Sequence, residues 1–224
     1  MTFSIVAQCF DTGMFGVAVA SSSPAVAARC AFARAGVGAV ASQNVTDPAL
    51  GPQTLDLMER GASAQEAVAI VARASRHAEF RQILAVDRRG DAAIHSGHRS
   101  LGIWTAEAGA ACACGGNLLA NESVPGAMTA AFEQSRGHIG DRLIATMRAA
   151  LVAGGEAGPI HSAGMLMVRE MPWPVADLRC DWTMDCPVEL VATAWDVYKP
   201  QLDAYVTRAR NPAEAPSYGV PGDA

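Results

Sequence analysis

The 224-residue sequence carries little charge and almost no lysine. Asp, Glu, Lys and Arg together make up 17% of the residues, while 50% are hydrophobic, which is typical of a globular chain rather than a disordered one. Lys199 is the only lysine, so most positions at which a catalytic lysine is found are excluded. The net charge of −5 is mild and argues against nucleic acid as a partner.

Long apolar runs and a cysteine framework are also missing. No stretch approaches about 18 uninterrupted apolar residues, so we expect no membrane-spanning segment and no membrane partner. The first residues contain no basic segment ahead of an apolar run, so we expect no signal peptide. The six cysteines follow no framework spacing, which indicates reduced and buried thiols. Together these features predict a cytoplasmic protein.

Hydrophobic periodicity predicts helices in pairs rather than singly between strands. This order disfavours a doubly wound Rossmann sheet and favours antiparallel sheets covered by helices, an α+β fold. We expect a single domain over residues 1–210 and a flexible tail over 211–224. Residues 25–34 are compatible with a short helix or an irregular crossing. The expected strands are 3–10, 14–21, 36–43, 81–86, 92–95, 109–119, 162–168 and 175–182, and the expected helices are 47–60, 63–74, 123–134, 140–153 and a last one from 185, broken near Pro200.

A small hydroxyl residue, Thr2, follows the initiator Met1. Initiator Met is usually removed ahead of so small a side chain, so we expect a mature chain that begins at Thr2. The free α-amine of such a residue has a pKa of about 7.7–8.0, so a fraction is neutral near pH 7 and can take the hydroxyl proton. The strand behind Thr2 holds it rigidly. The alternative is that Thr2 is the first residue of an ordinary strand.

The chain resembles the DUF1028 family, a group of small bacterial proteins that are themselves similar to Ntn-hydrolases. The resemblance covers about residues 1–170, and the opening together with the 33–43 block is its most specific part. It implies a four-layer αββα sandwich of two antiparallel sheets, an N-terminal nucleophile and hydrolysis of an amide bond, but it supplies no substrate. The matching segments are 1–7 (MTFSIVA), 16–21 (GVAVAS), 33–43 (ARAGVGAVASQ), 116–119 (GNLL) and 162–164 (SAG).

Two further residues are expected beside the nucleophile. Arg34 lies 32 positions after Thr2, about where proteasome-like Ntn-hydrolases have a lysine at the start of a strand. The positive charge of a guanidinium favours the neutral form of the nearby Thr2 amine. A guanidinium cannot itself act as a base, because its pKa exceeds about 12. A structural ion pair is an equally good reading of Arg34. Ser21 ends the second strand, where its hydroxyl can bond the Thr2 amine or serve as an ordinary turn residue.

Amide side chains near strand ends are candidates for an oxyanion hole or a substrate clamp, because they stabilise a developing negative charge. Gln43 and Asn44 end the third strand, and Asn117 follows a strand of small residues. Asn44 and Asn117 are equally typical of turns. His161 opens a later strand and is a candidate substrate contact, although a surface histidine is the more common role.

Metal and cofactor sites are not expected. Cys112 and Cys114 share a strand face, but Cys180 and Cys186 do not complete a zinc pattern with them. The His95-x-x-His98 pair is similarly incomplete, and Gly36-x-Gly38 lacks the continuation that a dinucleotide-binding loop requires.

Two functions therefore stay open. The first is an amidohydrolase that uses Thr2 to cleave a small amide or peptide-like substrate. The second is a non-catalytic protein that binds a small metabolite in the same cleft, which the missing lysine favours. We also expect a homo-oligomer, at least a dimer, with the small-residue strands and the 182–195 region as its interface.

Overall fold

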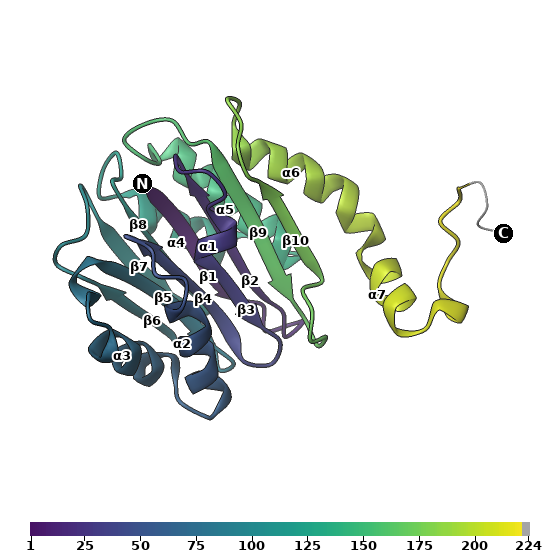
Figure 1. Cartoon of the computed structure of the whole chain (residues 1–224). Helices are drawn as coiled ribbons and strands as arrows, with labels where there is room; N and C mark the ends of the chain where they lie inside the picture. Colours follow the sequence, from purple (N-terminus) through teal and green to yellow (C-terminus); the bar gives the residue numbers. More distant parts are fainter. Residues whose placement is uncertain (221–224) are drawn as a thin grey trace.

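Two antiparallel β-sheets pack face to face in the structure, a computed structural model that describes residues 1–220 (Figure 1). One sheet has six strands in the order β10-β9-β2-β1-β8-β7, and the other has four in the order β3-β4-β5-β6. The six-stranded sheet consists of β10 (Ala176–Cys180), β9 (Ser162–Val168), β2 (Phe15–Ser21), β1 (Thr2–Gln8), β8 (Cys112–Asn117) and β7 (Thr105–Gly109), and the four-stranded sheet of β3 (Ala31–Arg34), β4 (Gly38–Asn44), β5 (Arg81–Asp87) and β6 (Ala92–Ser96).

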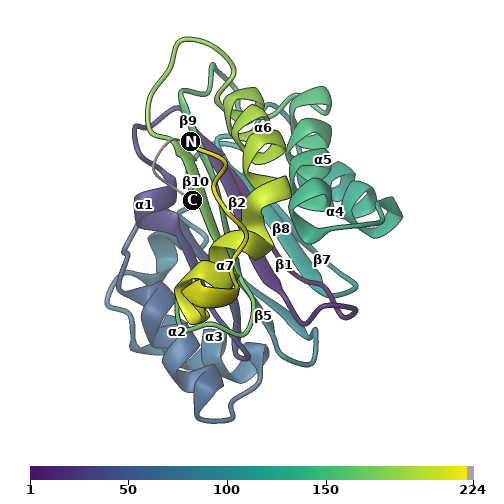
Figure 2. The ribbon, with the colours of Figure 1, turned by 90° about the vertical axis from the view of Figure 1, so that its right-hand side faces the viewer.

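Helices cover the outer face of each sheet (Figure 2). Helices α2 and α3 pack on the four-stranded sheet, and α4, α5 and α6 pack on the six-stranded sheet. The predicted αββα sandwich is therefore confirmed. The helices are α1 (Ala27–Cys30), α2 (Leu50–Glu59), α3 (Ala64–Ala74), α4 (Val124–Gln134), α5 (Ile139–Val152), α6 (Pro187–Tyr198) and α7 (Leu202–Arg210), with 3₁₀ turns at Ala78–Phe80, Lys199–Gln201 and Pro212–Glu214.

Local signals place several helix ends correctly. Ser63 and Glu66 form the predicted capping box, in which each side chain bonds the backbone N–H of the other. The 3₁₀ turn that contains Pro200 separates α6 from α7, as expected, because proline lacks the N–H that a continuous helix needs. Part of the predicted tail is placed, through residue 220, and residues 221–224 lie outside the described residues.

The sequence prediction missed two strands, β3 and β7. Both are edge strands with a single partner, and β3 has four half-buried residues without a polar and apolar alternation. The strand expected over 109–119 is in fact split, because Ala111 has a φ of +58° and turns the chain between β7 and β8. Helix α2 begins at Leu50, later than predicted, with Ala49 and not Asp47 at its N-cap, and Asp47 accepts from the backbone N–H of Ala49 in the turn ahead of it.

The alternation along β1 decides which side chains lie between the sheets. Phe3, Ile5 and Ala7 belong to the core under α4 and α5, whereas Val6 packs against residues of β4 and β5 in the core between the sheets. Because successive side chains of a strand point to opposite faces, Thr2 and Ser4 share the face of Val6. The start of β1 therefore directs two hydroxyl groups toward the four-stranded sheet.

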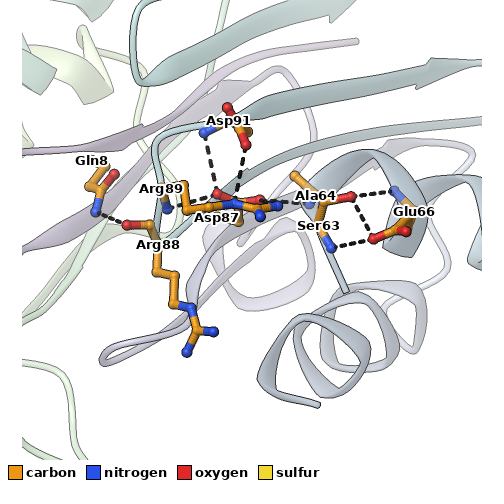
Figure 3. Close-up of polar contacts among 8 residues, drawn as sticks. All are labelled: Gln8, Ser63, Ala64, Glu66, Asp87, Arg88, Arg89 and Asp91. Carbon is orange, nitrogen blue, oxygen red and sulfur yellow. Dashed lines mark hydrogen bonds and ion pairs between the residues drawn. The ribbon is translucent and has the colours of Figure 1, made fainter. Parts of the chain in front are cut away.

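The buried carboxylate of Asp87 connects elements at the other end of the sandwich, where β1 ends at Gln8 (Figure 3). Asp87 is 3% exposed and accepts from the backbone N–H groups of Ala64 at 2.9 Å, Arg89 at 2.8 Å and Asp91 at 3.3 Å. It therefore joins the end of β5 to the first turn of α3. Gln8 lies at the same end and donates to the carbonyl of Arg88 at 3.0 Å.

Asp87→Asn is expected to lower the free energy of unfolding by about 2 kcal/mol, the value of hydrogen bonds to a charged acceptor. An amide turns one of the two accepting oxygens into a donor, so a buried backbone N–H loses its partner. Denaturant unfolding monitored by circular dichroism measures the change. Asp91→Asn is the control, because the Asp91 side chain is 65% exposed. Equal effects of the two substitutions would contradict this role.

Candidate functional site

Thr2 lies in a row of four polar residues across neighbouring strands. Asn117 of β8 is its direct partner on one side. On the other side Phe3 pairs with Ala20, so the same register carried one step further places Ser21 of β2 next to Thr2, and Ser21 pairs with Ser162 of β9. Directly opposed residues of antiparallel strands share a face. All four are at most 5% exposed, so buried polar groups gather at the start of β1.

The carbonyl oxygen of Met1 connects two of these hydroxyl groups. It accepts hydrogen bonds from Thr2 Oγ1 and from Ser21 Oγ. The backbone N–H of Ser23 donates to Ser21 Oγ at 3.0 Å and fixes its direction. Ser21 therefore lies beside the acyl group on the Thr2 nitrogen, where the sequence prediction places it.

Asn117 presents an unsatisfied donor at the same point. Its side chain is 1% exposed, and Nδ2 has no hydrogen-bond partner among residues 1–220. A buried polar group left without a partner costs about 1–3 kcal/mol, so such groups call for an explanation. A free N–H donor on the residue paired with Thr2 is suited to donate to the oxygen of a carbonyl group bound there.

A buried hydrogen-bond network supports the row from the four-stranded sheet. Ser4 Oγ donates to Gln43 Oε1 at 2.6 Å, and Gln43 Nε2 donates to Gln82 Oε1 at 2.7 Å. Gln82 Nε2 in turn donates to the carbonyl of Gly116 at 3.3 Å. The amide of Gln43 is thus occupied inside the protein, and its position indicates support of β1 and β8 rather than direct contact with a substrate. Gln82 was not singled out from the sequence.

Arg34 lies at the opposite end of the sandwich, and its predicted place beside Thr2 is wrong. It is the last residue of β3 and pairs with Gly38 at the start of β4, whereas Gln43 near the end of β4 contacts Ser4. Its guanidinium forms ion pairs with Asp56 at 2.8 Å and Glu59 at 2.7 Å on α2. The structural ion pair, the other reading of this residue, is what the structure contains.

The remaining predicted residues, Asn44 and His161, have structural partners. Asn44 has a φ of +78°, donates from Nδ2 to the carbonyl of Phe80 at 2.6 Å and accepts from the Leu101 N–H at 3.3 Å. It joins two loops. His161 donates its backbone N–H to the Ser21 carbonyl at 2.8 Å, while its ring stacks on Trp182 at 4.5 Å. His161 is therefore next to the row, with its ring directed to the 182–183 loop.

Glu156 belongs to the site and was missed in the sequence. It is 5% exposed, and both carboxylate oxygens accept from the Ser22 N–H, at 3.1 and 3.3 Å. Burial raises the pKa of the Glu156 carboxyl to about 7, against the opposing effects of the amino terminus and of the Ser22 hydrogen bonds. The signal in the sequence is slight: one acidic residue among the glycines of the 154–158 segment.

Met1 covers the row in this structure. Thr2 is 5% exposed, and the Met1 side chain lies against Gly158. Surface hollows in the described part of the chain lie away from it, among them one of about 440 Å³ lined by Gln8 and Arg142 and one of about 460 Å³ lined by Arg34 and Trp173. Access to Thr2 therefore requires that Met1 leave.

Metal ligands do not gather in the described part of the chain. Among residues 1–220 no group of three His, Cys, Asp or Glu side chains is placed to hold a metal ion. Cys112 and Cys114 are fully buried, and a hydrogen bond between their thiols lowers the pKa of Cys112, while burial raises that of Cys114. No helix within residues 1–220 has the length and apolar character needed to cross a membrane.

Comparisons with known proteins identify relatives of the chain. The crystal structure of protein SPO2555 from Silicibacter pomeroyi, described by the family model DUF1028, is 31% identical, with a TM-score of 0.83 over 88% of this chain and 86% of that chain. Anbu (ancestral beta-subunit) from Yersinia bercovieri is 12% identical, with a TM-score of 0.40 over 91% of this chain and 97% of that chain, too low a similarity to carry an argument. No curated protein matches the sequence. The model of DUF1028, a family of unknown function, matches residues 2–190, and the chain belongs to this family.

Proposed function

We propose that the protein is an amidohydrolase whose nucleophile is the hydroxyl of Thr2, exposed together with its α-amine when Met1 is removed. The observation that carries the proposal is the unpaired Nδ2 donor of Asn117 directly opposite Thr2. A nucleophile with a buried amide donor beside it is the combination that acyl transfer needs. The resemblance of the opening segment to Ntn-hydrolase-like proteins supports the same reaction class.

The proposed reaction has two stages. Thr2 Oγ1 attacks the substrate carbonyl and its proton passes to the α-amine, while Asn117 Nδ2 donates to the oxyanion. Collapse breaks the C–N bond, and the leaving amine takes the proton from the α-ammonium group. Water then hydrolyses the ester on Thr2 with the amine again accepting a proton. In the proposal Ser21 Oγ, which donates to the Met1 carbonyl oxygen in the structure, bonds the freed amine.

An intact-mass measurement followed by a covalent probe tests the proposal. The purified protein should have the mass of the chain without Met1, and a β-lactone probe should add once, at Thr2. Retained Met1 blocks the amine and overturns the hydrolase, which leaves the non-catalytic binding of a small metabolite as the better function. A mature chain that gives no adduct at Thr2 overturns it as well.

Asn117→Ala is expected to slow β-lactone addition at Thr2 by about 10²–10³-fold, the usual effect of removing one oxyanion donor. The reaction rate is followed by intact mass. Asn121→Ala is the matched control, since the Asn121 amide donates to the Ala153 carbonyl at 2.7 Å and has a structural role. If both variants react at the wild-type rate, Asn117 does not stabilise the oxyanion.

The setting of this reaction is also a proposal. We place it in the cytoplasm, where thiols such as the six free cysteines stay reduced.

Self-association is proposed through the segment that leads into α6, because Trp182 is 55% and Met184 80% exposed. Trp195, at the other end of the predicted interface region, is 1% exposed and bonds Asp141, so it belongs to the core instead.

A further inference from the structure

Glu156 lies across the start of β1. The 154–158 segment pairs with the chain that leaves β8, through Ala120 N–H to the Gly155 carbonyl at 3.0 Å and Ala157 N–H to the Leu118 carbonyl at 2.9 Å. The Glu156 side chain reaches the other way, to the N–H of Ser22 just after β2. Since β1 lies between β2 and β8, the side chain and the backbone of Glu156 together connect both neighbours of the strand that carries Thr2.

In the structure the amino terminus near this carboxylate is that of Met1, one residue ahead of Thr2, and its positive charge lowers the pKa of Glu156 against the larger effect of burial. Among residues 1–220, Glu156 forms no ion pair with an arginine, lysine or histidine side chain; Ser22 and Leu119, which contact it from the ends of β2 and β8, do not titrate. His161 lies beyond Ser21, with Nδ1 at 2.8 Å from the Thr183 carbonyl. A buried carboxylate without a cationic side chain either takes up a proton or is stabilised by a positive group, and the start of the chain is the positive group beside Glu156.

We propose that Glu156 binds and orients the α-amine of mature Thr2, an inference that rests on the proposed function. Its carboxylate accepts a hydrogen bond from the amine and so directs the nitrogen lone pair toward Thr2 Oγ1. It then stabilises the ammonium group that forms when the hydroxyl proton moves to the amine, until the leaving amine takes that proton. Glu156 itself gains and loses no proton in this cycle, and it acts as a positioning residue through the amine.

The inference predicts a change in the protonation of the amine. An opposite charge nearby favours the charged form, so Glu156→Gln should lower the pKa of the Thr2 α-amine by about one unit or more. Glutamine keeps an oxygen that accepts from the Ser22 N–H, so the loop is retained. Reductive methylation with ¹³C-formaldehyde labels only the α-amine and Lys199, because the chain has a single lysine. The ¹³C shift of each is then followed against pH.

Lys199 serves as an internal reference. Its ammonium group forms an ion pair with Asp141 of α5 at 2.6 Å, so the substitution of Glu156 should leave its midpoint unchanged. The exposed Glu122→Gln is the control variant, as it removes a carboxylate from the chain that follows β8. We expect the α-amine midpoint to fall in E156Q alone, and the acid limb of the rate of β-lactone addition to move to lower pH with it. If E156Q does not fold, Glu156→Asp replaces it and should keep the wild-type midpoint more closely than Glu156→Ala.

Equal midpoints in wild-type protein and E156Q overturn the inference, and β-lactone addition at Thr2 then still supports the hydrolase. A shifted midpoint without any adduct in the wild-type protein overturns the hydrolase instead. Retained Met1 overturns both, because the amine is then not that of Thr2.

Discussion

Thr2→Ala is expected to reduce ester formation with a β-lactone at residue 2 by at least about 10³-fold, whereas Thr2→Ser retains the reaction. Alanine keeps the small size that permits removal of Met1 and keeps the free amine, but it lacks the nucleophile. Serine restores the hydroxyl at the same position. The comparison therefore isolates the oxygen atom from every other property of the chain terminus.

The chemistry of the adduct sharpens this comparison. A β-lactone that reacts with Thr2 Oγ1 leaves an ester, which hydroxylamine cleaves, while reaction with the α-amine leaves a stable amide. We expect a hydroxylamine-sensitive adduct on the wild-type protein and on T2S, and only a slow, resistant one on T2A. A sensitive adduct of equal rate on T2A would show that another residue is the nucleophile, and peptide mapping would identify it.

The sequence was informative where the cause of a structure is local. Alternation along β1 correctly assigns Val6 to one face and Phe3 to the other, because a strand has a period of two residues. The Ser63 capping box needs only three residues of context. The hairpin of β1 and β2 follows from a short turn between two apolar runs, and it brings Ser21 to the level of Thr2.

The site itself depends on distances along the chain that no local pattern encodes. The contact between Glu156 and Ser22 spans 134 residues, and that between Gln43 and Gln82 spans 39. Glutamine is not unusual in the segment around Gln82, and one acidic residue among glycines is only a slight signal for Glu156, so neither residue was singled out. Arg34 shows the opposite error. A spacing of 32 residues suggested proximity to Thr2, but β3 ends at Arg34 instead of beginning there.

The buried carboxylate of Glu156 also predicts how stability depends on pH. Its pKa rises from 4.5 to about 7 on folding, so the folded state binds this proton more tightly than the unfolded state. The stability that the protonated form contributes is complete below about pH 4.5 and is lost as the pH rises through about 7. Because glutamine does not ionise, E156Q should keep this contribution to stability as the pH rises.

In the chain that carries Met1, as the structure does, we expect E156Q to gain about 3 kcal/mol of unfolding free energy relative to the unsubstituted protein between about pH 4.5 and 7.5, at about 1.36 kcal/mol for each pKa unit. Denaturant unfolding of both proteins across this range, with the state of Met1 fixed by intact mass, measures the difference. The exposed Glu122→Gln should change stability by less than about 0.5 kcal/mol throughout. In the mature chain the α-amine of Thr2 holds Glu156 ionised, so there the difference between E156Q and wild type should stay nearly constant over this range. A constant difference in the chain that carries Met1 would contradict the raised pKa of Glu156.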